Sequence, residues 1–408
     1  MTSDEGSPVA PATATAPPPD DQHGSIEPVR SFLRALLVAA RDPRRGTVLR
    51  DTNDPLDEET LRHLIERERV GPLLHRAVAA RELLPPATRT LLAESHRATA
   101  MRNLLLLHEL GVCLARLSDA RVPAIVLKGA ALAQPVYGSL ALRPMVDLDI
   151  LIHRRDLARA RAIIEKLGFR PMRLETHPGA LVEHENELAF AKPGAVTVEL
   201  DVHWRLIDSP FYQRELATEW FWSSARVQRL SRDLSAPTLG ADAQLLHLCA
   251  HLMLHHRGTR LLWWSDIAEL IHVQGRALDW TEVIDRSRRY RLLLPMRIVL
   301  AGLAEEWSVP IPADVLPRLA DFRPSREEAD LFRSHSGPAS AGQRFWSDLH
   351  HMGSWRQGLT FARTNLVPSR AYMRGRYDIR RPWLVPLYYP YRWLRGLRGA
   401  GRRGAHRE

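Results

Sequence analysis

"LRPMVDLDILI", residues 142–152, is a mostly apolar stretch that contains two aspartates, Asp147 and Asp149. Successive side chains of a β-strand point to opposite faces, so the two carboxylates would share one face and the aliphatic residues around them the other. The aliphatic face can pack against a helix, but two neighbouring carboxylates are costly unless a cation neutralises them. The stretch therefore predicts a buried strand whose polar face binds a metal ion.

A second strand with the same pattern is predicted in "VTVELDVHW", residues 196–204, where Glu199, Asp201 and His203 fall on the polar face. Carboxylate oxygens, together with phosphate oxygens and water, form the octahedral shell that Mg²⁺ prefers. A third carboxylate can hold a second ion and deprotonate an attacking hydroxyl. Asp201 is the expected third carboxylate, because it lies nearer the end of its strand. Glu199 is expected to line the cleft or else to be solvated. His203 is expected to line the cleft or else to have a structural role.

"AIVLKG", residues 124–129, predicts a short strand that ends just before a helix. Gly129 allows close approach of the backbone to a ligand, and the free N–H groups of the helix N-terminus, with the Lys128 ammonium, favour triphosphate oxygens. Gly138 and Ser139 are the alternative to Gly129 as the residues that contact phosphate. Arg143, just before the acidic strand, is expected either to contact a phosphate or to lie on the surface.

These stretches resemble a known family. "VLKGAALAQPVYGSLALRPMVDLDILI", "VELDVHW" and the later "LLWWSDIAELI" are similar to the uncharacterised bacterial nucleotidyltransferase family of the polymerase-beta-type nucleotidyltransferase superfamily. The resemblance implies an α+β fold in which a small mixed sheet, with helices on one face, is flanked by helical segments. It also implies transfer of a nucleoside monophosphate from an NTP to an acceptor hydroxyl, with release of pyrophosphate.

By this resemblance Asp147 and Asp149 match the metal-binding pair, and Asp201 matches the third carboxylate. Lys128 and Gly129 stand where the superfamily usually has Gly-Ser. The serine is absent beside Gly129, and the gap to Asp147 is longer than usual. A non-catalytic nucleotide-binding or scaffold protein that kept the fold is therefore the alternative function.

The expected cofactor is Mg²⁺ or Mn²⁺, and the expected NTP is ATP. The acceptor stays open, because the fold and the metal site do not determine it: a sugar or aminoglycoside-like hydroxyl, a protein side chain and an RNA end all suit the same carboxylates. A large nucleic-acid partner is not expected, because the chain in front of its basic C-terminus is close to neutral.

A histidine stripe is the second chemical feature. In "LLHLCAHLMLHH", residues 245–256, His247, His251 and His255 are spaced four apart and would share one face of a helix. A zinc hydrolase is a third candidate function, although no glutamate completes an H-E-x-x-H arrangement. The other interpretations are that His251 and His255 line the cleft, or that the histidines are hydrogen-bonded at an interface, with Asp266 bonded to the stripe.

The organisation of the chain follows from composition and periodicity. Residues 1–27 are rich in Pro, Ala, Ser and Thr and offer too little apolar surface to fold. Helical spacing then alternates with the strand-rich segment described above. The expected units are a disordered segment 1–27, a helical segment 28–120, a nucleotidyltransferase core 121–207, a helical domain 208–330 and a basic segment 331–408.

The expected location is the cytoplasm. Cys113 and Cys249 stand in apolar, helix-like surroundings, which gives no disulfide framework, and we find no secretory or membrane-spanning pattern. Residues 370–408 hold eleven arginines against two acidic residues, 11 − 2 = +9 of the formal net charge of +10. The aromatic and basic segment 382–404 is expected to dock on the protein, with weak peripheral contact to an anionic membrane or RNA as the alternative.

Overall fold

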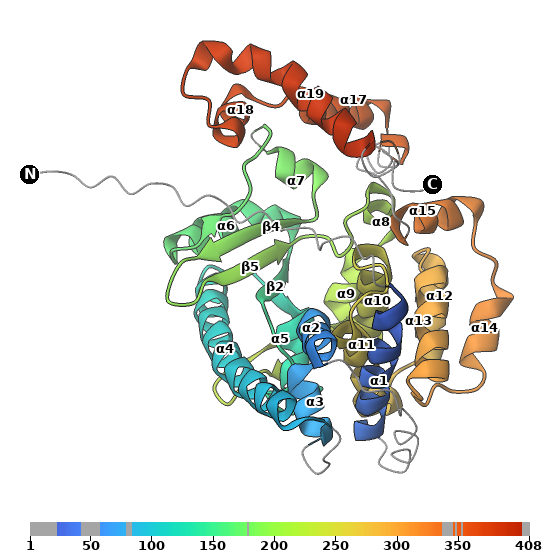
Figure 1. The fold of residues 1–408 in the computed structure, drawn as a ribbon. Coiled ribbons are helices and arrows are strands. Elements are labelled where there is room, and N and C mark those ends of the chain that lie inside the picture. Colours follow the sequence, from blue (N-terminus) through green and yellow to red (C-terminus); the bar gives the residue numbers. More distant parts are fainter. Residues whose placement is uncertain are drawn as a thin grey trace, which may run out of the picture.

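The computed structural model describes residues 23–41, 58–78, 84–177, 179–336, 346, 349–351 and 354–401. Figure 1 shows a central sheet, helices from both ends of the chain packed together beside it, and a separate group of C-terminal helices. This arrangement confirms the expected α+β class, a small mixed sheet flanked by helical segments.

The sheet is mixed. β2 runs parallel to β5 and β1 runs parallel to β7, whereas the other neighbouring strands are antiparallel. β4 and β5 form a hairpin around "KPGA", residues 192–195, where Pro193 and Gly194 favour a tight reversal. The strand order is β3 (Arg170–Pro171), β4 (Glu187–Lys192), β5 (Val198–His203), β2 (Asp147–Ile152), β1 (Ala124–Leu127), β7 (Ser235–Thr238) and β6 (Arg226–Arg229).

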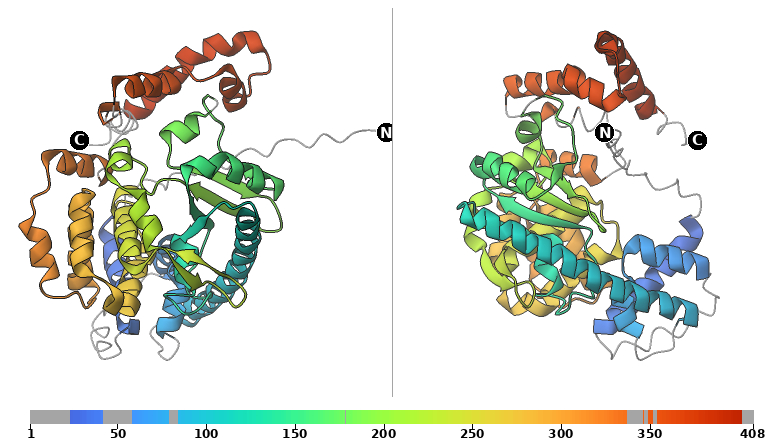
Figure 2. Two further views of the ribbon diagram at one scale, coloured as in Figure 1. Left: turned by 180° about the vertical axis from the view of Figure 1, so that it is seen from behind. Right: turned by 90° about the vertical axis from the view of Figure 1, so that its left-hand side faces the viewer.

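The two faces of the sheet pack against different cores. Leu148, Ile150 and Leu200 belong to a core shared with α4 (Pro86–Asp119) and α6 (Leu157–Lys166). The right-hand view of Figure 2 shows α4 running across this face. Strand alternation places Asp147 and Asp149 on the opposite face, beside Ile125, Leu127 and Leu151, which join the core of the flanking helices. The carboxylates are thus directed towards those helices.

Helix α6 ends as its sequence predicts. Gly168 has φ +91°, its N–H donates to the Glu165 carbonyl at 3.0 Å, and the Phe169 N–H donates to the Ile164 carbonyl at 3.3 Å. A residue in the left-handed region at this position satisfies carbonyl groups that would otherwise lack partners, and glycine adopts it without a steric cost.

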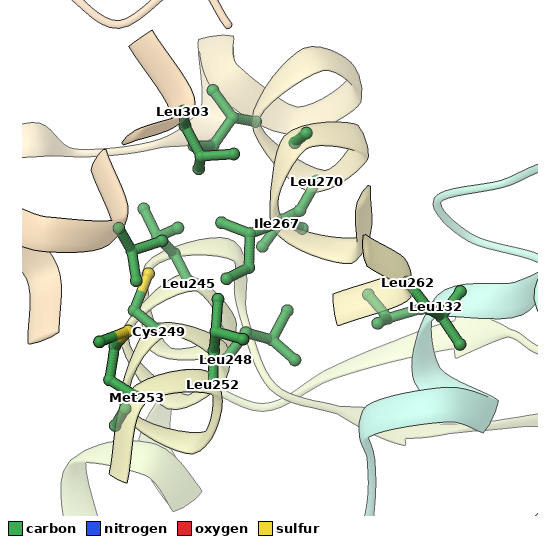
Figure 3. Close-up of a cluster of buried hydrophobic side chains, with 14 of the residues drawn as sticks. Leu132, Leu245, Leu248, Cys249, Leu252, Met253, Leu262, Ile267, Leu270 and Leu303 are labelled. Carbon is green, nitrogen blue, oxygen red and sulfur yellow. The ribbon is translucent and has the colours of Figure 1, made fainter. Parts of the chain in front are cut away.

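The helices from the two ends of the chain share one core. Side chains of α1 and α3 pack with those of α10 and α13, and Figure 3 shows part of this cluster around Leu245, Cys249 and Leu303. The N-terminal helices are α1 (His23–Arg41), α2 (Glu58–Glu68) and α3 (Gly71–Val78). The later ones are α10 (Ala241–Ala250), α11 (Leu261–Gln274), α12 (Trp280–Arg289), α13 (Leu293–Glu306), α14 (Val315–Asp321) and α15 (Arg326–Ser336).

Shorter elements connect these layers. The structure has α5 (Lys128–Ala133), the 3₁₀ turn η3 (Arg154–Asp156), α7 (Ala180–His184), α8 (Pro210–Glu215), α9 (Thr218–Ser224), the π-helix η4 (His251–His255) and the 3₁₀ turn η5 (Gly275–Ala277). Towards the C-terminus follow α17 (Trp355–Leu366), α18 (Arg370–Tyr377), the 3₁₀ turn η6 (Pro382–Leu384) and α19 (Val385–Gly401).

Two boundaries differ from the sequence prediction. Helix α1 begins at His23, so the last five residues of the expected disordered segment 1–27 are helical, and residues 1–22 lie outside the described part of the chain. The β6–β7 hairpin belongs to the segment 208–330, which was expected to be helical, yet β7 pairs with β1 and extends the sheet. Its strands of four residues, exposed in β6, carry too weak an alternation to be recognised.

The aromatic C-terminal segment docks on the preceding helices. The Tyr389 hydroxyl donates to the Pro368 carbonyl at 2.6 Å, and the Trp393 indole N–H donates to the Leu366 carbonyl at 2.7 Å. Trp383 remains exposed. None of the helices in the described part of the chain combines the length and the apolar character needed to cross a membrane.

Candidate active site

The parallel pairing of β2 and β5 brings the predicted carboxylates together. Asp149 is the register partner of Asp201, and Leu151 is the partner of His203. Partners on parallel strands point to the same face. Ligand atoms of Asp149, Asp201 and His203 lie within 4.8 Å of one another, which is the group suited to a metal ion among the described residues. Asp147, which the sequence paired with Asp149 as a metal ligand, lies outside this group at the start of β2.

A cavity of about 240 Å³ opens between these strands and the flanking helices. It contains six of the predicted residues: Lys128, Gly129, Arg143, Asp147, Asp149 and Asp201. His251 and His255 also line it, as one interpretation of the histidine stripe expected. The predicted residues outside its lining are Gly138, Ser139, Glu199 and His203.

Lys128, Asp149 and His203 form a buried network beside the cavity. Lys128 Nζ lies 2.5 Å from Asp149 Oδ1 and 3.4 Å from His203 Nε2, which is itself 2.9 Å from Asp149 Oδ1. Burial alone would raise the pKa of Asp149, but the Lys128 ammonium and the His203 hydrogen bond lower it well below its usual range. Asp149 is thus a carboxylate held ionised, and Lys128 is its fixed counter-charge.

The other two aspartates are compensated less completely, although the Lys128 charge attracts both of them. Burial and then the Asp149 charge raise the pKa of Asp147, and burial, Asp149 and Glu187 raise the pKa of Asp201 to about 8. Ionising both therefore requires another positive charge nearby. This donor set fits Mg²⁺ or Mn²⁺, because hard divalent cations prefer carboxylate oxygens.

Arg143 does not lie on the surface, and that interpretation was wrong. Its side chain is buried and donates two hydrogen bonds to Asp266, from Nε at 3.2 Å and from Nη2 at 2.9 Å, while the Tyr137 hydroxyl donates to Asp266 at 2.8 Å. Asp266 is therefore bonded to Arg143 and Tyr137, and its expected bond to the histidine stripe was wrong. Gly129 leaves room for this pair, because a Cβ atom there would overlap Arg143 Nη1.

We predict that Gly129→Ala lowers the free energy of unfolding by about 1–3 kcal/mol, because the added methyl group displaces the Arg143 guanidinium from a packed position. Urea unfolding followed by circular dichroism measures this. Gly111→Ala is the matched control: Gly111 lies inside α4, and its added Cβ would make only ordinary contacts with Leu234. The control should change stability by about 1 kcal/mol at most, in the stabilising direction. Equal stability of the two variants would contradict the packing argument.

The histidine stripe is interrupted by a π-helix. Helix α10 ends at Ala250 and η4 continues over His251–His255, so His251 and His256 face each other with their Nε2 atoms 2.9 Å apart. Burial lowers the pKa of His247 to about 3 and that of His251 well below its usual range. The stripe is thus a neutral wall at ordinary pH, and it forms no metal-suited group among the described residues.

Five polar or aromatic residues that line the cavity were not predicted from the sequence. Their approach depends on how the helices of the common core pack, which no local pattern encodes. The loop "RGTR", residues 257–260, was the available signal, because it supplies Arg260 directly before the stretch "LLWWSDIAELI" that was already singled out. The five are Arg69, Glu187, His256, Arg260 and Trp263.

Comparison with known proteins agrees with this geometry. Residues 54–308, more than half of the chain, match a family model described as uncharacterised nucleotidyltransferase. The match includes β1, β2 and β5 with all the carboxylates of the cavity. It also includes Arg69, which follows α2, and Arg260, which precedes α11. No curated protein matches the chain. The protein therefore belongs to the uncharacterised nucleotidyltransferase family.

Proposed function

We propose that this protein is a Mg²⁺- or Mn²⁺-dependent enzyme that transfers a nucleoside monophosphate from an NTP, with ATP as the expected donor, to a hydroxyl group of a small molecule or protein. The observation that carries the proposal is the register pairing of Asp149 with Asp201, with Asp147 at the rim of the same cavity. Three carboxylates around one small cavity suit phosphoryl chemistry, which depends on positioning and charge.

In this proposal Asp147, Asp149 and Asp201 hold the metal, which when bound supplies positive charge to the phosphate oxygens. Lys128 keeps Asp149 ionised and oriented. Asp201, ionised once the metal is bound, would accept the proton of the acceptor hydroxyl as the general base. The acceptor oxygen forms a bond to the α-phosphorus, the bond to the β-phosphate oxygen breaks, and pyrophosphate leaves.

The test is incubation of the purified protein with each α-labelled NTP and Mg²⁺ or Mn²⁺, with a panel of acceptor hydroxyl compounds. We expect metal-dependent release of pyrophosphate and at least tenfold less in Asp147→Asn. This variant suits the purpose because, among the described residues, the Asp147 side chain has no hydrogen-bond or ion-pair partner that the substitution would leave unpaired. Equal release from the variant would contradict the assigned role.

One observation favours a second candidate, a nucleotide-binding protein without transfer activity. Lys128 contacts both Asp149 and His203, so an internal cation already lies beside two of the three metal-suited side chains. Metal-dependent NTP binding that requires Asp147, without pyrophosphate release across the acceptor panel, would support this candidate.

A further inference from the structure

Two arginines of the cavity wall form no close ion pair with an acidic residue in the described part of the chain, although Asp147 attracts the charge of Arg69. Arg69 follows α2 in the N-terminal helices and Arg260 precedes α11 in the later helices, and both line the cavity that contains Asp147 and Asp149. Within the described part of the chain, neither side chain makes a hydrogen bond or an ion pair, and Arg260 lies over the Trp263 ring at 4.7 Å. This wall thus carries two positive charges that no direct ion pair neutralises.

The positive charges of Arg69 and Arg260 repel each other. Burial and then repulsion from Arg260 lower the pKa of Arg69. The pKa of His256 is lowered to about 3 by burial, by His255 and Lys128, and then by the charges of both arginines. Both arginines also adopt left-handed backbone conformations, with φ of 56° for Arg69 and 60° for Arg260, which residues other than glycine rarely adopt. Strain and repulsion persist at functional sites where a ligand compensates for them.

Lys128 and Arg143, the cations that the sequence predicted to bind phosphate, already form ion pairs with carboxylates of the protein. Lys128 is paired with Asp149, and Arg143 donates two hydrogen bonds to Asp266. A polyanion in the cavity would therefore meet Arg69 and Arg260 as the free donors of the described wall, and a guanidinium binds phosphate oxygens in a bidentate manner. The volume of about 240 Å³ is below the roughly 300–1,000 Å³ of pockets that enclose a drug-sized ligand, which suits a phosphate chain better than a whole nucleotide.

We propose that Arg69 and Arg260 bind the polyphosphate tail of the nucleotide, so that the anion subsite is supplied by the two helical segments and not by Lys128 and Gly129 at the start of α5. This inference rests on the proposed function for the identity of the ligand. The two walls of the cavity then have separate roles, because the strands supply the carboxylates and the helices supply the cations that orient the leaving pyrophosphate.

Calorimetric titration with inorganic tripolyphosphate in the presence of Mg²⁺ tests the subsite without a nucleoside. We expect wild-type protein to bind it, Arg69→Met and Arg260→Met to bind about tenfold more weakly each, and the double variant about a hundredfold more weakly. Methionine keeps the length and apolar stem of arginine at a left-handed position. AMP affinity should change by less than about twofold, because AMP lacks the β- and γ-phosphates.

Two controls make the same change of charge elsewhere. Arg257→Met alters a residue of the same loop with φ 54° that lines a neighbouring cavity, and Arg62→Met alters an exposed residue of α2. Both should bind tripolyphosphate as the wild type does. Unfolding temperatures of all variants show whether any loss of binding is a loss of fold.

The outcomes separate this inference from the proposed function. Tripolyphosphate binding that is absent in the wild type, or unchanged in the double variant, overturns the subsite. If the arginines are needed for tripolyphosphate binding but no pyrophosphate is released with any acceptor, the subsite stands and transfer fails. If transfer is normal in the double variant, the proposed function stands and the subsite fails.

Discussion

Asp201→Asn is expected to lower nucleotidyl transfer by about 10²–10⁴-fold, the usual contribution of a general base, and at the same time to stabilise the metal-free protein. The gain in stability arises because burial and the Asp149 and Glu187 charges raise the pKa of Asp201 to about 8 from its ordinary value of 3.8. The folded protein therefore binds this proton more tightly than the unfolded chain. The stability that the protonated Asp201 contributes is present in full below pH 3.8 and is lost as the pH rises through 8.

Asparagine removes the charge that the fold disfavours, so the difference between variant and wild type should grow from about pH 4 to pH 8. At pH 9 in the presence of a chelator we expect a gain of about 1–3 kcal/mol in the free energy of unfolding, reduced from the full shift because the side chain is partly exposed. Urea unfolding at pH 5 and pH 9 measures it. Added Mg²⁺ should stabilise the wild type more than the variant.

Glu199→Gln is the control for this prediction. Glu199 lies two residues before Asp201 on the same strand and pairs in register with Asp147, but it does not line the cavity. Transfer should stay within about threefold of the wild type, since the half-buried Glu199 side chain has no place in the lining of the cavity. Normal transfer in Asp201→Asn together with a loss in Glu199→Gln would show that the roles of the two carboxylates are reversed.

Lys128→Met is expected to lower the free energy of unfolding by about 3–5 kcal/mol, the cost of leaving a buried charge without its partner. The Asp149 side chain is 3% exposed and Lys128 Nζ is 2.5 Å from it. The pKa of Asp149 is lowered and that of Lys128 is raised. The pair therefore stabilises the fold in full between pH 3.8 and pH 10.5, the ordinary values of the two groups, and the effect fades outside that window.

The double variant Lys128→Met/Asp149→Asn separates the lost pair from lost packing. It should recover most of the stability that Lys128→Met loses, because no charged carboxylate is then left unpaired. Thermal and urea unfolding of the wild type, both single variants and the double variant complete the cycle. A double variant as unstable as the sum of the single variants would mean that Lys128 and Asp149 do not interact.

The β-strand pattern made part of the site predictable. Alternation alone places Asp147 and Asp149 on one face, and the same rule places Asp201 and His203 together on the other acidic strand. The register that sets Asp149 opposite Asp201 depends on the parallel pairing of two strands separated by a helix and a hairpin. No local signal encodes it, so His203 appeared as a cleft residue and not as a neighbour of the metal-suited carboxylates.

The positions of the arginines in the cavity could not be predicted from the sequence, for a different reason. Arg143 and Asp266 are 123 residues apart, and their bond depends on how α11 packs against the sheet. Arg69 and Arg260 are brought to one cavity by a core that unites both ends of the matched region. Hydrophobic periodicity predicts each helix but not the partner that it packs against.

The common core of the N-terminal and later helices also determines how large a fragment of the chain must be to keep the site complete when it is moved to another protein. A fragment limited to the strands from β1 to β5 would carry every carboxylate of the site, yet it would expose Ile125, Leu127 and Leu151 to water and would lack both arginines. The smallest transferable module is therefore one that includes helices on both sides of the strands. Insertions into this protein are best tolerated at the outer loops of its helices, away from the core that the helices share.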